Sequence, residues 1–118
     1  MPDPLRVLFV CAMNQWRSPT AEAMYRHDTR LQVRSAGVRS EARRRLSDSD
    51  VAWADVIFVM EHKQKARIQE QFREVQLPPV MVLDVPDDYT YLDPELQRLL
   101  QASIEPELQA LLELRAGG

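Results

Sequence analysis

Short apolar runs alternate with segments of helical spacing along this chain. The apolar runs predict buried strands, and a stretch of strict alternation predicts an edge strand with one wet face; these strands cover Leu5–Cys11, Leu31–Ser35, Val56–Met60 and Val80–Leu83. Helices are predicted between and after them, over residues 19–27, 47–53, 61–74 and 94–112. Strands that alternate with helices in this way indicate an α/β domain with a parallel sheet.

Three residues add local detail to this pattern. Ser47 begins a helix whose first turn is acidic. Pro106 is expected to kink or divide the last helix, because proline removes a hydrogen bond and clashes with the preceding turn. Gly37 is expected to adopt a turn conformation that other residues resist.

The segment from Cys11 to Ser18 carries the most specific chemistry. The first strand ends at Cys11, and Ser18 followed by Pro19 marks a helix start, so the segment reads as strand, tight loop and helix. Such a loop turns backbone N–H groups and a helix N-terminus toward one point, which suits an anion and favours the thiolate form of Cys11. Arg17 offers two parallel donors to a phosphate, and Ser18 can donate its hydroxyl to the thiolate. A lone cysteine at a strand end is usually an inert core residue, but this combination indicates phosphoryl transfer through sulfur.

These residues resemble a known family. Cys11, five residues, Arg17-Ser18 and then Pro-Thr-Ala-Glu look like the loop of the low molecular weight protein tyrosine phosphatases. Further similarities follow in family order at Ser35-Ala36-Gly37, Ala54–Met60 and Asp84–Tyr89. The resemblance implies one compact domain over residues 1–118, with four parallel strands in the order 2-1-3-4 and helices on both faces.

The implied activity is hydrolysis of a phosphate monoester, with phosphotyrosine inherited from the resemblance alone. Cys11 acts as the nucleophile, and Asp87, which follows Val85-Pro86 in the position of the family's acid, protonates the leaving oxygen; Asp88 is the rival. Arg17 and the loop hold the phosphate, which gives the binding set Ala12, Met13, Asn14, Gln15, Trp16, Arg17 and Ser18. Asn14 is expected to stabilise the loop by tolerating left-handed backbone angles. Trp16 and Tyr89 are candidates to flank an aromatic leaving group.

The composition of the chain limits the classes of partner that it is expected to bind. A net charge of -3 over 118 residues gives no electrostatic footprint for nucleic acid, so the expected partner is a phosphorylated protein or a small aryl or alkyl phosphate. One cysteine excludes an intramolecular disulfide, and one cysteine with two histidines is too few for a usual structural zinc site; no metal or cofactor is needed. A thiol that must stay reduced fits the cytoplasm, and no apolar run is long enough for a membrane span.

The sequence departs from the family pattern in three places, and the one that bears on substrate preference is a shorter segment between Gly37 and Ala54, which borders the pocket in the family. Met13 stands where glycine is common, and Trp16 replaces a second cysteine found in many members. The arginines of residues 43–45 read as a solvated rim, or else as a basic lip for a phosphorylated partner. Two other classes remain open: a cysteine phosphocarrier, which needs neither Arg17 nor Asp87, and a non-catalytic phosphate-binding module.

Overall fold

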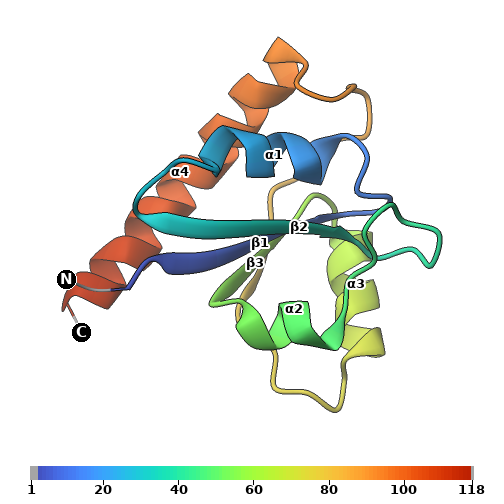
Figure 1. Ribbon diagram of the computed structural model, residues 1–118, viewed down its shortest axis with the longest axis horizontal. Helices are drawn as coiled ribbons and strands as arrows, with labels where there is room; N and C mark the ends of the chain where they lie inside the picture. Colours follow the sequence, from blue (N-terminus) through green and yellow to red (C-terminus); the bar gives the residue numbers. More distant parts are fainter. Residues whose placement is uncertain (1–2, 118) are drawn as a thin grey trace.

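A four-stranded parallel sheet forms the centre of the molecule (Figure 1). The computed structural model describes residues 3–117. The strands are β1 (Leu5–Cys11), β2 (Leu31–Gly37), β3 (Val56–Val59) and β4 (Val80–Val82), in the order β2-β1-β3-β4. The predicted fold class and strand order are therefore confirmed.

Helices cover both faces of the sheet. They are α1 (Arg17–Tyr25), α2 (Asp48–Trp53), α3 (His62–Gln71) and α4 (Pro94–Gly117). In Figure 1, α1 and α4 lie on one side of the sheet and α2 and α3 on the other. All four strands run in the same direction, so their carboxyl ends meet at one edge, which is where a ligand site is expected.

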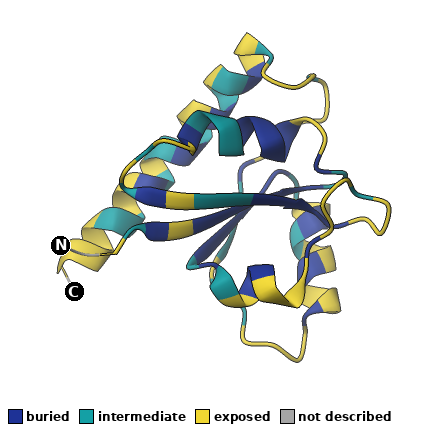
Figure 2. Ribbon diagram, in the orientation of Figure 1, coloured by how far each residue is buried: buried dark blue, intermediate teal, exposed yellow. Residues whose placement is uncertain are grey.

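A hydrophobic core lies on each face of the sheet. The strand β1 contributes side chains to both cores, because successive side chains along a strand point to opposite faces. Phe9 packs with the α1 and α4 side, where Phe58 stacks against it with ring centroids 5.9 Å apart. Leu8 and Val10 pack with the α2 and α3 side. Nearly every residue of β1 is buried, as shown by the dark central strand in Figure 2.

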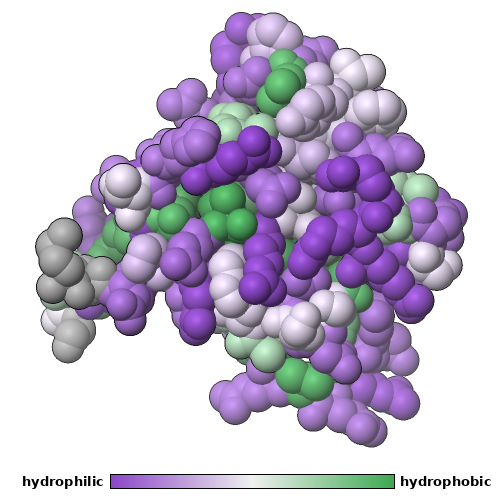
Figure 3. All heavy atoms as spheres, in the orientation of Figure 1, coloured by the Kyte–Doolittle hydropathy of each residue, from purple (hydrophilic) through white to green (hydrophobic). Residues whose placement is uncertain are grey.

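The surface is mainly polar. The face drawn in Figure 3 is largely hydrophilic, with hydrophobic side chains in small separate patches. No helix within residues 3–117 is both long enough and apolar enough to cross a membrane.

The helix α4 corrects one of the two alternatives predicted for Pro106, the division of the helix. It continues as one element through Pro106 and is not divided there. Leu100 and Ile104 before the proline and Leu108 after it are all fully buried against the sheet. This packing on both sides of Pro106 offsets the one hydrogen bond that proline removes.

Gly37 corrects another prediction, that it adopts a turn conformation. It is the last residue of β2, paired with Cys11 across the sheet, and no glycine among the described residues has a positive φ. Its role is close approach. A Cβ at this position would lie 2.7 Å from the Ala12 carbonyl oxygen and 2.6 Å from the Ala42 Cβ. Glycine therefore lets the loop after β1 pass directly over the end of β2.

Candidate active site

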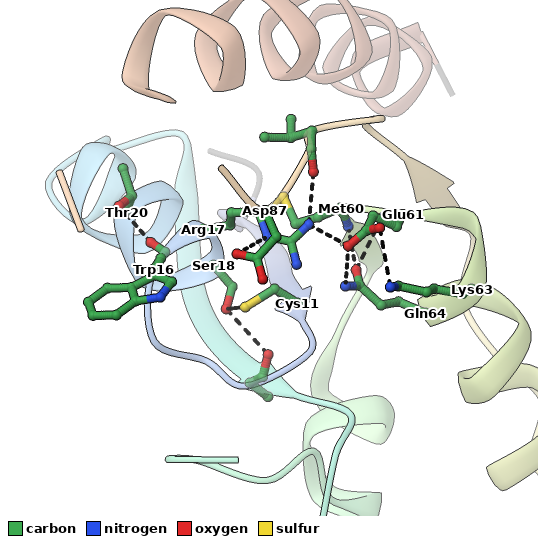
Figure 4. Close-up of polar contacts among 12 residues, drawn as sticks. Cys11, Trp16, Arg17, Ser18, Thr20, Met60, Glu61, Lys63, Gln64 and Asp87 are labelled. Carbon is green, nitrogen blue, oxygen red and sulfur yellow. Dashed lines mark hydrogen bonds and ion pairs between the residues drawn. The ribbon is translucent and has the colours of Figure 1, made fainter. Parts of the chain in front are cut away.

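Cys11 ends β1 at the carboxyl edge of the sheet, and polar side chains surround its sulfur. Its Sγ lies 2.9 Å from Ser18 Oγ in a buried contact. Asn14 Nδ2 donates to Ser18 Oγ over 3.0 Å and to Ser35 Oγ over 2.9 Å. The Ser18 hydroxyl can in turn donate to the sulfur, or to the Ala36 carbonyl oxygen, which lies 3.4 Å away. Figure 4 shows Ser18 beside Cys11 at the start of α1.

The loop from Cys11 to Arg17 has its carbonyl groups turned outward. The carbonyl oxygens of Cys11, Ala12 and Met13 accept from the backbone N–H groups of residues 38, 39 and 43 over 2.9 to 3.1 Å. Asn14 O accepts from Arg43 Nε over 2.9 Å. Across a trans peptide the next N–H points the opposite way, so these bonds turn loop N–H groups inward. None of the N–H groups of residues 12–16 donates to an acceptor in the described part of the chain.

The backbone of Asn14 makes this turn possible. Its φ is 55°, in the left-handed region that asparagine tolerates better than most side chains. The expectation from sequence for Asn14 is therefore confirmed. Its side chain is fully buried below the loop, where it supports the loop from inside through Ser18 and Ser35.

Arg17 is buried and held from one side. Only 2% of it is exposed, and its Nη1 donates to Glu61 Oε1 over 2.6 Å and to the Val85 carbonyl over 2.8 Å. Its Nε is buried and has no hydrogen-bond partner among the described residues. A buried donor without a partner is costly, so this atom points to an acceptor that an incoming anion would supply.

Glu61 was not found by sequence analysis. It lies two residues after the end of β3, the strand next to β1 in the sheet, and forms a reciprocal cap with Gln64 at the start of α3 (Figure 4). Burial raises the pKa of the Glu61 carboxyl, but the hydrogen bond and charge of Arg17 outweigh burial, so the net pKa is lowered. The sequence did hold an indication of this role. Glu61 is a carboxylate that follows the strand beside β1, and the carboxyl ends of parallel strands share one edge of the sheet.

Asp87 lies on the open side of the guanidinium. Its Oδ1 is 3.6 Å from Arg17 Nε, and its side chain is 59% exposed. A small hollow of about 40 Å³ lies between Cys11 and Asp87, and residues 12, 13, 15, 16 and 17 complete its lining. Asp88 is exposed and does not line this hollow. The geometry thus brings Asp87, rather than its neighbour, to Cys11 and Arg17.

Comparison with known proteins agrees with this geometry. The family model for low molecular weight phosphotyrosine protein phosphatase matches residues 6–45, which contain β1, the loop, α1 and β2. Over these residues the chain is similar to the low molecular weight protein tyrosine phosphatases. No sequence among curated proteins matches it.

Solved structures share the fold of this chain over almost its whole length. YfkJ from Bacillus subtilis is 19% identical with a TM-score of 0.73, covering 95% of this chain and 97% of that one. SP-PTP, a low molecular weight protein tyrosine phosphatase from Streptococcus pyogenes, is 17% identical with a TM-score of 0.76 and coverage of 91% and 93%. The YwlE arginine phosphatase from Geobacillus stearothermophilus is 25% identical with a TM-score of 0.70 and coverage of 91% and 94%.

The two aromatic candidates occupy different places in the structure. The Trp16 indole points away from Cys11, toward the side of α1 (Figure 4). Tyr89 is half-buried and packs against the core, and it does not line the hollow above Cys11. The structure therefore does not bring Trp16 and Tyr89 together as a pair around the sulfur.

The arrangement as a whole can hold and attack a tetrahedral oxyanion. A sulfur nucleophile, inward N–H groups and a guanidinium meet at one small hollow, with a carboxyl group at its rim. Fixed donors of this kind stabilise charge that develops on phosphate oxygens.

Proposed function

We propose that the protein hydrolyses phosphate monoesters through a phosphocysteine at Cys11. The observation that carries this proposal is the buried, unpartnered Nε of Arg17 beside Cys11 and the inward N–H groups of the loop. Arg17 is already oriented by Glu61 and the Val85 carbonyl, so little reorganisation is needed when phosphate enters.

The reaction proceeds in two steps. The Cys11 thiolate attacks phosphorus in line, a sulfur–phosphorus bond forms, and the bond from phosphorus to the leaving oxygen breaks as protonated Asp87 supplies the proton. Water then attacks the phosphocysteine, Asp87 takes a proton from it, and the sulfur–phosphorus bond breaks to release inorganic phosphate and the thiolate. Ser18, 2.9 Å from the sulfur, stabilises the thiolate as leaving group.

The substrate class we propose is phosphotyrosine in proteins. It is supported by the family model that matches residues 6–45 and by the name of the Streptococcus pyogenes enzyme. Phosphoarginine is the second candidate, because an arginine phosphatase is among the similar structures at 25% identity. We also propose a single catalytic domain over residues 1–118. We propose a cytoplasmic location as well, since Cys11 acts only as a free thiol.

The decisive experiment compares Cys11→Ser, Asp87→Asn and Asp88→Asn in steady-state hydrolysis. Cys11→Ser abolishes turnover but still binds phosphate, since the loop donors remain. Asp87→Asn lowers kcat about 10² to 10⁴-fold on a substrate with a poor leaving group, because the proton donor is lost. The loss is smaller with a good leaving group, such as a nitrophenyl phosphate.

Asp88→Asn is the matched control and keeps nearly normal kcat. Full activity of Cys11→Ser would remove the sulfur from the mechanism. A large loss in Asp88→Asn with none in Asp87→Asn would transfer the acid role. A phosphocarrier would give a stable phosphocysteine without release of phosphate, and a binding module would give no turnover in the unmodified protein.

A further inference from the structure

A second, larger groove lies beside the hollow above Cys11. Its volume is about 400 Å³, and it is lined by side chains from α1, the turn before α2 and the loop before α4. It shares Gln15 and Trp16 with the hollow, so the two are continuous. Its other principal residues are Glu22, Arg26, Arg43 and Tyr91.

The groove follows α1 for its whole length. Trp16 lies immediately before the helix, Glu22 in its middle and Arg26 immediately after it. A helix rises 1.5 Å per residue, so these positions extend over roughly 15 Å. An extended peptide advances about 3.3 Å per residue, and the groove therefore matches a segment of about four residues.

The side chains that line the groove carry a net positive charge, whereas the whole chain carries a net negative charge. Arg26 is exposed, and no carboxylate in the described part of the chain lies within ion-pair distance of it. Arg43 donates a hydrogen bond to the Asn14 carbonyl through its Nε. Its terminal nitrogens remain available to a ligand. The Glu22 carboxylate already accepts from Ser35 Oγ over 2.7 Å.

Two exposed aromatic rings line the same groove. Trp16 is 41% exposed and Tyr91 is 44% exposed, although large apolar side chains are usually more buried. Thr20 links the backbone segments that carry the two rings. Its Oγ1 donates to the Trp16 carbonyl over 2.7 Å and accepts from the N–H of Leu92, the residue after Tyr91, over 2.9 Å.

The backbone next to Tyr91 is strained and firmly held. Leu92 has a φ of 63°, which is unfavourable for a branched side chain. Besides its bond to Thr20, its carbonyl accepts from Gln97 Nε2 over 2.8 Å. Strain that is held by surrounding bonds is typical of functional sites, and here it fixes Tyr91 in the groove.

We propose that this groove binds an acidic peptide segment next to the phosphorylated residue of a protein substrate. The proposal rests on the proposed function for the position of the phosphate. Arginines without carboxylate partners suit aspartate and glutamate side chains, and the two rings suit the apolar parts of a peptide. A mononucleotide would fill the end near Trp16 but leave Arg26 out of reach, given the length of the groove.

The test measures kcat/KM for phosphotyrosyl peptides of one length whose flanking residues are glutamate, glutamine or lysine. The variants are Arg26→Glu and, as a matched control, Arg67→Glu on the exposed side of α3 across the sheet. Unmodified protein prefers the glutamate peptide over the lysine peptide roughly tenfold at low salt, and salt weakens the preference. Arg26→Glu removes or reverses it, chiefly through KM, whereas Arg67→Glu keeps it. Hydrolysis of a small aryl phosphate is unchanged in both variants.

Each outcome decides for or against the groove. Equal kcat/KM for the three peptides, or a preference that Arg26→Glu does not change, would overturn the proposal. So would a nucleoside monophosphate that is hydrolysed better than every peptide. If even the small aryl phosphate is not hydrolysed, the proposed function has failed, and binding to Cys11→Ser decides the groove separately. At least threefold tighter binding of the glutamate peptide, lost in Cys11→Ser with Arg26→Glu, supports it; equal binding refutes it.

Discussion

Single residues at the carboxyl edge of the sheet are selected for backbone shape as much as for chemistry. Asn14 carries a positive φ that the sequence allowed us to predict from the residue type. Gly37 was predicted as a turn residue, but it is needed because the Ala12 carbonyl passes too close for a Cβ. The position of Glu61 after β3 was an indication that it lies near the site, but its contact with Arg17 joins residues 44 positions apart and could not be read from local sequence.

Gly37→Ala should damage the loop and the stability of the fold together. The added Cβ would meet the Ala12 carbonyl and the Ala42 Cβ at distances that force the loop to move. We expect a loss of about 1 to 3 kcal/mol in the free energy of unfolding and a fall in kcat/KM of at least tenfold. Urea unfolding and steady-state hydrolysis measure the two effects.

Gly117→Ala is the control, because a Cβ there meets open space near the end of α4. It should leave both measurements within error of the unmodified protein. A Gly37→Ala variant with full stability and activity would show that the loop adjusts freely.

Among the secondary-structure elements, helix starts were less predictable than strands. Ser18 was expected as the N-cap or a first-turn residue of a helix from residue 19; α1 begins two residues earlier, at Arg17, so Ser18 lies in its first turn, and its hydroxyl contacts Cys11 instead of capping the helix. Ser47 caps α2 as predicted, since it forms a reciprocal pair with Asp50. The strands were easier because continuous burial of β1 and β3 leaves an unbroken apolar run.

Asp50 connects α2 to its surroundings and should make stability depend on pH. Its fully buried carboxylate caps α2 and pairs with Arg44 at 2.6 Å and Arg34 at 3.4 Å. Burial raises the pKa of Asp50, but the bonds from Arg44 and Ser47 outweigh burial and lower it overall. A lowered folded-state pKa gives stability that is present above the unfolded value, about 3.9, and is lost as pH falls through the lower folded value.

Asp50→Asn should therefore lower the free energy of unfolding by about 1 to 3 kcal/mol at neutral pH. The difference from the unmodified protein should shrink as pH falls below the unfolded value and through the lower folded pKa of Asp50, because the carboxyl then becomes neutral. Urea unfolding across this range measures it, with exposed Asp48→Asn as the control on the same helix. A deficit that stays constant with pH would mean that the charge of Asp50 contributes nothing.

On the scale of the whole molecule, Arg17 joins elements that are distant in sequence. It begins α1, while its guanidinium contacts Glu61 after β3 and the Val85 carbonyl after β4. Gly37 at the end of β2 supports the same loop from below. A ligand bound in this loop therefore holds the carboxyl ends of the strands together.

Inorganic phosphate should accordingly raise the Tm of the protein. A ligand that binds only the folded state at 100 times its Kd stabilises by about 2.7 kcal/mol. Cys11→Ser should retain this shift, whereas Arg17→Lys should lose most of it, because an ammonium cannot replace the planar pair of donors. Thermal unfolding with phosphate, and with chloride at equal ionic strength, measures the difference.

An equal rise in Tm for Arg17→Lys would show that the guanidinium does not bind the phosphate. A rise with chloride as large as that with phosphate would show only general screening of charge.

The 3.6 Å approach of Asp87 to Arg17 also bears on how each catalytic cycle ends. Once the newly formed phosphate dianion occupies the loop and Asp87 has given its proton to solvent, two anions share one guanidinium. Their mutual repulsion would weaken retention of the product, so the carboxyl group that we propose as the acid would also help to empty the site for the next substrate.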